Sequence, residues 1–281
     1  MAPVTPPVKT PPPPPPPPPK VANGAPPVVS DPGAFSVSSG VVGGAKRIVI
    51  YGPGGIGKST LANLAPNPIT IDIEDGTREL NVTRLTGVGD LQSLRACLHS
   101  NALDQYSTII IDSATRAEEW AIAHTLATVQ NERGSTVTSI EGYGYGKGYQ
   151  HVYDTFLLLM SDLDHHVRQG RNVILIAHDC TADVPNPVGD DYIRYEPHLQ
   201  GPKSGRASIR NRVIQWADYV LFVGYDVAAT KDGKGKGGGT RTIFAVERPD
   251  HIAKSRTTVP NIQFKNETDN AIWLAINGGK S

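Results

Sequence analysis

Residues 52–59 read GPGGIGKS, and the types and spacing of these residues suit the binding of a polyphosphate. The segment matches the pattern G-x-x-x-x-G-K-[ST] and lies between an apolar stretch and a short helix-like stretch. Glycines let backbone N–H groups encircle phosphate oxygens, Lys58 reaches the outer phosphates, and the Ser59 hydroxyl binds Mg²⁺. We therefore expect ATP and Mg²⁺ as cofactors. The expected nucleotide-binding residues are Gly52, Pro53, Gly54, Gly55, Ile56, Gly57, Lys58, Ser59 and Thr60.

A second part of a phosphate site is the stretch STIIIDS, in which an apolar run ends at Asp112. In a P-loop fold, a carboxylate at the C-terminal end of such a strand holds the Mg²⁺ ion. The metal ligands predicted from the sequence are therefore Ser59 and Asp112. The residue after this aspartate is Ser113, which is no general base, so the group that activates water has to come from elsewhere.

The stretch ITIDIEDG offers such a group, because it places Glu74 just after the second strand-like segment. The carboxyl ends of neighbouring strands converge on the ligand in sheets of this kind, so Glu74 is the candidate base. The alternative is that Asp72, Glu74 and Asp75 only form a solvated end of the strand.

Strand-like and helix-like segments alternate from residue 47 onward, which predicts an α/β fold with a mainly parallel central sheet flanked by helices. The apolar strand-like segments do not alternate with polar residues, as expected when helices cover both faces. Expected strands cover 47–51, 69–73, 107–112 and 172–177, and expected helices cover 58–64, 91–99, 115–129 and 148–169.

In the C-terminal part, two strand-like segments follow each other with only a glycine-rich tip between them, which predicts an antiparallel β extension of the sheet. A long polar connection covers 178–196, a helix is expected over 207–216, and strands are expected over 219–225 and 241–247, joined by the glycine-rich tip 231–240. A final strand is expected over 271–276. The economical division is one ATPase domain from 46 to 281, preceded by an arm.

The arm, residues 1–45, contains 15 of the 24 prolines, including the unbroken run Pro11 to Pro19. Proline lacks the backbone donor, and the arm has few large apolar groups, so we expect it to be disordered with polyproline II character. It is either a solvated tail or a spacer that docks in an aromatic groove of a partner.

Charge, cysteine content and the length of apolar stretches limit the expected partners and cellular location. Lys plus Arg and Asp plus Glu both number 27, so net charge indicates neither nucleic acid nor an anionic membrane as a partner. Residues 203–256 are nevertheless basic, with eleven Lys and Arg against five Asp and Glu. Two cysteines exclude a disulfide framework, and no apolar stretch reaches the length of a membrane span. We expect a soluble protein of the cytoplasm with no membrane partner.

Five segments in this order resemble the RecA-like recombination and helicase ATPases, which are P-loop proteins of the AAA type. They are GPGGIGKST, IDIEDG, STIIIDS, NVILIAH and IAKSR, spread over residues 47–256. The similarity is greatest to compact phage-encoded ATP-binding proteins that accompany single-strand annealing. It implies a RecA-like P-loop core, Mg-dependent ATP hydrolysis, and a host-cell cytoplasmic location if the chain is phage-encoded.

The resemblance also implies site roles. Glu74 would act as the catalytic base beside Lys58, and His178 would sense the γ-phosphate, unless it is only a histidine at the end of a strand. Lys254 and Arg256 would reach into the ATP site of a neighbouring subunit, which implies a homo-oligomer with ATP at its interfaces. The alternative for this pair is a solvated surface position.

Loops that bind DNA in this family correspond to about 132–149 and 179–212, so single-stranded DNA is the expected macromolecular partner. Tyrosines would stack on bases and cations would contact phosphates, or the tyrosines would merely pack their loop against the domain. The candidate residues are Tyr143, Tyr145, Tyr149, Lys147, Lys203, Arg206, Arg210 and Arg212.

The leading function is therefore an ATPase that acts on single-stranded DNA in phage recombination, annealing or replication, with an annealing or single-strand-binding protein as a further partner. One alternative is a small-molecule kinase on the same P-loop scaffold. The other is a nucleotide-gated binding module without significant turnover.

Overall fold

The computed structural model describes residues 38–202, 206–229 and 235–278. A compact unit comprises Gly44–Ser281. Most of the proline-rich arm, Lys203 and part of the predicted tip at 231–240 lie outside the described residues, so the predictions made for them stay predictions.

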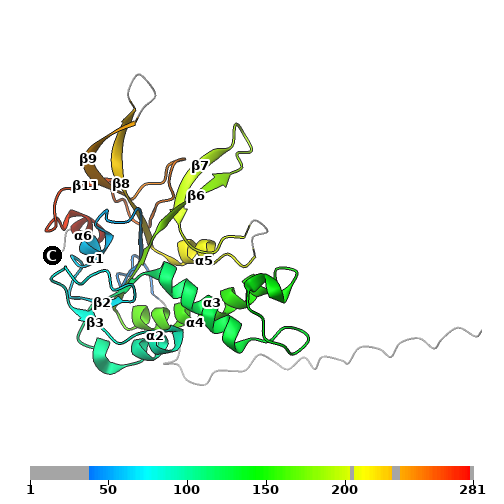
Figure 1. Cartoon of the computed structure of the whole chain (residues 1–281). Coiled ribbons are helices and arrows are strands. Elements are labelled where there is room, and N and C mark those ends of the chain that lie inside the picture. Colours follow the sequence, from blue (N-terminus) through cyan, green and yellow to red (C-terminus); the bar gives the residue numbers. More distant parts are fainter. Residues whose placement is uncertain (1–37, 203–205, 230–234, 279–281) are drawn as a thin grey trace, which may run out of the picture. The chain divides into compact units, whose positions relative to one another are not determined.

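A sheet of nine described strands forms the centre of this unit, and its larger part is parallel (Figure 1). In spatial order the parallel strands are β3 (Arg84–Leu85), β2 (Pro68–Asp72), β4 (Thr108–Asp112), β5 (Asn172–Ala177), β1 (Arg47–Tyr51) and β8 (Tyr219–Ala229). Antiparallel strands extend it beyond β8, namely β9 (Gly235–Phe244) and β11 (Ile262–Phe264), while β10 (Lys254–Ser255) also pairs with β8. The predicted fold class is confirmed.

Helices cover both faces of the sheet. One face carries α2 (Leu91–Leu98), α3 (Ala114–Thr128), α4 (Lys147–Arg168) and α5 (Ile209–Trp216), and the other carries α1 (Lys58–Ala62) and α6 (Ala271–Ile276) (Figure 1). Within β1, Val49 packs in the hydrophobic core on the face of α2, α3, α4 and α5, whereas Ile48 and Ile50 pack in the core on the face of α1 and α6. Because successive side chains of a strand point to opposite faces, a strand covered on both faces is apolar throughout.

The structure corrects the prediction of a final strand at 271–276, which forms the helix α6. Ile272, Trp273 and Ile276 are buried, a spacing that fits one side of a helix. The indole N–H of Trp273 donates a hydrogen bond of 2.9 Å to Leu61 O, which fastens α6 to α1. An apolar run of six residues carries no period that separates strand from helix.

The predicted polar connection at 178–196 is also wrong. It contains the antiparallel hairpin of β6 (Asp179–Val184) and β7 (Tyr192–Pro197), which projects from the end of β5 (Figure 1). Its strands alternate between more and less exposed residues, and the turn residues of PNPVGDD lie between them. The hairpin follows the strand that ends at Ala177, beside the expected sensor His178.

Candidate nucleotide-binding site

The glycine-rich loop leaves the carboxyl end of β1 and enters α1 at Lys58, as the motif requires. Glycine is needed at both ends of the loop. A Cβ on Gly52 would lie 2.2 Å from Val223 O of β8, and Gly57 has a φ of 103°, in the left-handed region. Gly54 and Gly55 between them are exposed, so the loop presents backbone to an incoming ligand.

Lys58 folds over this loop. Its Nζ donates hydrogen bonds of 2.8 Å to both Gly52 O and Pro53 O, and the residue is buried. Burial lowers the pKa of Lys58, while the carboxylates of Asp112, Asp179 and Glu74 act in the opposite direction. The ammonium group is therefore held at the mouth of the loop, where it can exchange its carbonyl partners for phosphate oxygens.

The two predicted metal ligands meet. Ser59 Oγ donates a hydrogen bond of 2.6 Å to Asp112 Oδ2, across the 53 residues that separate them in the chain. Burial raises the pKa of Asp112 to about 6, the Ser59 hydroxyl opposes this shift, and the charge of Glu74 adds to it. A hydroxyl and a carboxylate at one point are the oxygen ligands that Mg²⁺ prefers, so these residues fit the ion. Bound Mg²⁺ would neutralise charge on the phosphates.

Glu74 lies beside this pair. The Ser113 hydroxyl donates a hydrogen bond to Glu74 Oε1, and His178 Nε2 lies 3.1 Å from Oε2 of the same carboxylate. The Glu74 side chain keeps 27% of its surface exposed, so water reaches it. The structure thus brings together three side chains from the ends of β2, β4 and β5.

The two aspartates next to Glu74 have other contacts. Asp72 accepts hydrogen bonds from Thr77 and from the backbone N–H of Gly76, which close the turn after β2, and these bonds lower the pKa of Asp72 against the effect of its burial. Asp75 is paired with Arg78 in an exposed ion pair. Of the three acidic residues, Glu74 is the one directed toward Ser113 and His178.

Two residues near the loop were missed from the sequence. Asp179 opens β6 directly after His178, and its charge acts on Lys58. Arg241 of β9 donates a hydrogen bond of 3.0 Å from Nη1 to Ile56 O. A polar residue after the apolar run of β5 was a usable signal for Asp179, whereas nothing local marks Arg241.

The predicted pair Lys254 and Arg256 lies elsewhere in the chain. Lys254 pairs with Val220 near the amino end of β8, and Arg256 N–H bonds Asp218 O. Tyr219, the first residue of β8, lies level with Ile48 of β1, three residues or about 10 Å from Tyr51, where the loop begins. The structure therefore does not bring this pair to the P-loop of its own chain.

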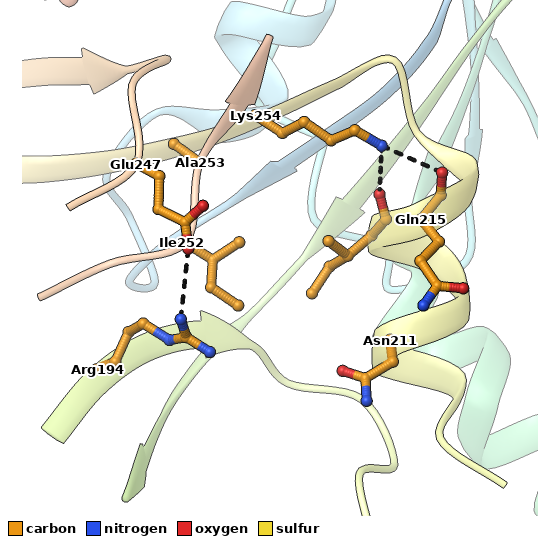
Figure 2. Close-up of a pocket in the computed structure, with 8 residues that line it drawn as sticks. Arg194, Asn211, Gln215, Glu247, Ile252, Ala253 and Lys254 are labelled. Atoms are coloured by element: carbon orange, nitrogen blue, oxygen red, sulfur yellow. Dashed lines mark hydrogen bonds and ion pairs between the residues drawn. The ribbon is translucent and has the colours of Figure 1, made fainter. Parts of the chain in front are cut away.

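Both side chains have partners within the chain. Lys254 Nζ donates to Ile214 O, Gln215 O and Ala217 O, at 3.0, 3.1 and 2.6 Å, and so caps the C-terminal end of α5. Figure 2 shows this ammonium on the wall of a recess of about 210 Å³, whose far wall holds the contact between Arg194 and Glu247.

Arg256 is 61% exposed and is paired with Asp218 at 2.6 Å.

The residues expected to contact DNA divide into two groups. Tyr143 is buried and its hydroxyl lies within hydrogen-bond distance of both Thr125 O and Val129 O, so for this residue the structure favours the alternative that it packs its loop against the domain. Arg210 is also unsuited to contact DNA phosphates, because its guanidinium bonds Leu199 O and the buried carboxylate of Glu196.

The other candidates for DNA contact are more exposed. Tyr149 is half-buried, and Lys147 is in an ion pair with Glu132. The exposed candidates are Tyr145, Lys147, Arg206 and Arg212.

Among the helices of the described residues, none combines the length with the apolar character that crossing a membrane requires. No curated protein shows significant similarity to this sequence. A family model described as an AAA domain matches residues 45–257, which is more than half of the chain. The chain therefore belongs to the AAA domain family of P-loop nucleotide-binding proteins.

Proposed function

We propose that this protein binds Mg-ATP in the loop 52–60 and hydrolyses it while acting on single-stranded DNA in phage recombination, annealing or replication. The observation that carries the ATPase part is the contact between Ser59 and Asp112 under the P-loop, with Glu74 next to it. The family supports nucleotide binding and hydrolysis. The resemblance of five ordered segments to annealing-associated ATPases supports the DNA part.

In this proposal Glu74 activates the attacking water. Its carboxylate is partly exposed and is held from two sides by Ser113 and His178, which fixes its orientation. A general base needs such a fixed position within reach of water, and base catalysis contributes about 10²- to 10⁴-fold to a rate. His178 links the base to the strand end at β5, where we propose that it senses the γ-phosphate.

We further propose that hydrolysis requires neighbouring subunits. The ATP site of a single chain holds Lys58, whereas the exposed Arg256 lies at the opposite end of the sheet and is available to a second copy. A cation supplied from a neighbour stabilises the charge that develops on the transferred phosphoryl group. Lys254 is not carried into this role, because its ammonium already caps α5.

For the DNA part, the exposed side chains Tyr145, Arg206 and Arg212 supply the stacking and phosphate contacts. The hairpin of β6 and β7 adds the exposed Ile193 and Tyr195, and its first strand begins next to His178. DNA bound to this hairpin would therefore act on the residue that contacts Glu74. An annealing or single-strand-binding protein is the proposed partner on the same DNA.

The test is ATP turnover measured with and without single-stranded DNA over a range of protein concentrations. We expect turnover per chain to rise with concentration, because sites are shared, and to rise on addition of DNA. The DNA effect should weaken steeply with salt, because phosphate contacts release counterions. Turnover that ignores DNA at every salt and protein concentration contradicts the DNA part, and turnover that requires an added small-molecule acceptor instead identifies a kinase.

A further inference from the structure

Arg241 connects the antiparallel extension to the phosphate-binding loop. It lies in β9 opposite Phe264 of β11, and its guanidinium carbon lies 4.6 Å from the centroid of that ring. From this position Nη1 donates to Ile56 O in the loop, at 3.0 Å. Strand register and a cation–π contact with a buried ring thus fix the guanidinium.

The loop is shaped around this arginine. A Cβ on Gly57 would lie 2.8 Å from Arg241 Nη1 and 3.0 Å from Phe264 Cε1, so a side chain at this position would displace the guanidinium from its place. Gly57 also has a φ of 103°, which disfavours any other residue. Gly57, the glycine that precedes Lys58, therefore leaves space for the guanidinium of Arg241 beside the loop and also permits the turn into α1.

The peptide that joins Ile56 to Gly57 shows what this contact does. In a planar trans peptide the C=O of one residue and the N–H of the next point in opposite directions. Because Arg241 holds Ile56 O, the Gly57 N–H is directed away from the guanidinium, and we take that side as the one where phosphate binds. A charged donor on the carbonyl also polarises the peptide and strengthens its N–H as a donor.

We propose that Arg241 is a positioning residue for nucleotide binding: it orients and polarises the Gly57 N–H through Ile56 O and so preorganises the loop for the phosphates. It acts in the same chain, unlike the cation proposed for Arg256. The antiparallel extension of the sheet thereby takes part in the site, although it lies on the side of β1 away from Asp112 and Glu74. This inference rests on the proposed function of the loop.

The experiment is calorimetric titration of the full chain with Mg-ADP, which binds without being hydrolysed. Arg241→Met removes the donor and keeps an apolar stem beside Phe264, and Arg241→Lys restores one charged donor. We expect the Kd to rise about tenfold in Arg241→Met, a change equal to about 1.4 kcal/mol, and to recover in part in Arg241→Lys. Arg168→Met, at the exposed arginine that ends α4, is the matched control and should bind as wild type.

Thermal unfolding of each variant and the ¹⁵N–¹H signal of Gly57 complete the test. The Gly57 amide should respond to Mg-ADP strongly in wild type, weakly in Arg241→Met and at an intermediate level in Arg241→Lys. Wild-type affinity in a folded Arg241→Met, while Lys58→Ala has lost binding, overturns the inference and leaves the nucleotide site standing. Equal losses of affinity and stability in Arg241→Met and Arg241→Lys also overturn it. Absence of binding by wild type contradicts the proposed function itself.

Discussion

Substitution of Lys254 by methionine separates a structural role from a role in a neighbouring ATP site. In the structure its ammonium donates to three carbonyls at the end of α5, so Lys254→Met leaves that helix end without its cap. A hydrogen bond to a charged group contributes about 1.5–3 kcal/mol, and a cation at a helix C-terminus about 0.3–1 kcal/mol. Burial, together with the nearby charge of Arg256, lowers the pKa of Lys254, which shows that part of this gain is offset by desolvation.

We therefore expect a net loss of about 1–2 kcal/mol in the free energy of unfolding. For a domain of this size the midpoint falls by about 2–4 °C per kcal/mol, so calorimetry should record a Tm lower by about 2–8 °C. ATP turnover per folded chain should stay near the wild-type value. A Tm equal to that of wild type, combined with lost turnover that mixing with Lys58→Ala subunits restores, refutes the capping role and supports a cation supplied between subunits.

Arg256→Met is the counterpart. Its ion pair with Asp218 is exposed, and such pairs contribute about 0–1 kcal/mol, so the Tm should change little. Turnover should fall and should return in mixtures with Lys58→Ala subunits, which keep Arg256 but lack their own Lys58. Failure of every mixing ratio to restore turnover argues against a shared site.

Three further predictions concern other residues. Glu74→Gln should lower ATP turnover by about 10² or more while Mg-ADP affinity stays near wild type, because the amide cannot accept the proton, and near-normal turnover would place the base elsewhere. Burial raises the pKa of Glu118 to about 7, so the folded chain binds a proton on the Glu118 carboxyl more tightly than the unfolded chain does. The protonated carboxyl therefore contributes to the free energy of unfolding at low pH, and this contribution is lost as pH rises through about 7. Since the side chain keeps some exposure, we expect Glu118→Gln to stabilise the protein by about 2 kcal/mol at pH 8 and hardly at pH 4, and equal unfolding midpoints of variant and wild type at pH 8 would contradict this. Arg212→Ala should weaken binding of single-stranded DNA and reduce the slope of log affinity against log salt by about 1, and an unchanged slope would remove Arg212 from the DNA surface.

The sequence predicted those features that depend on local spacing. The pattern of 52–59 located the loop between β1 and α1, and the apolar period of 148–169 located α4, where Val152, Phe156 and Leu163 are buried. The same reasoning placed Asp112 at the end of a strand, and the contact with Ser59 followed from the parallel order of the sheet.

Features that depend on long-range packing were out of reach. The stretch 271–276 is apolar enough for a strand, and it is a helix because Trp273 docks on α1, 212 residues away from its bonding partner. Arg241 reaches Ile56 only through the register of β9 with β11, which no local pattern encodes. Lys254 likewise belongs to the segment IAKSR, which resembles a family motif, but its ammonium bonds carbonyls at the end of α5, and the sequence does not show that these are nearby.

The most direct test of the nucleotide site is calorimetric titration of ATP into wild type and Lys58→Ala, in the presence of Mg²⁺ and again with the metal removed by a chelator. We predict saturable binding of one ATP per chain by wild type, weaker binding without Mg²⁺ because Ser59 and Asp112 then lack the ion they hold, and loss of most of the affinity in Lys58→Ala. Undiminished ATP binding by a folded Lys58→Ala would contradict the assignment of the loop 52–60 as the nucleotide site.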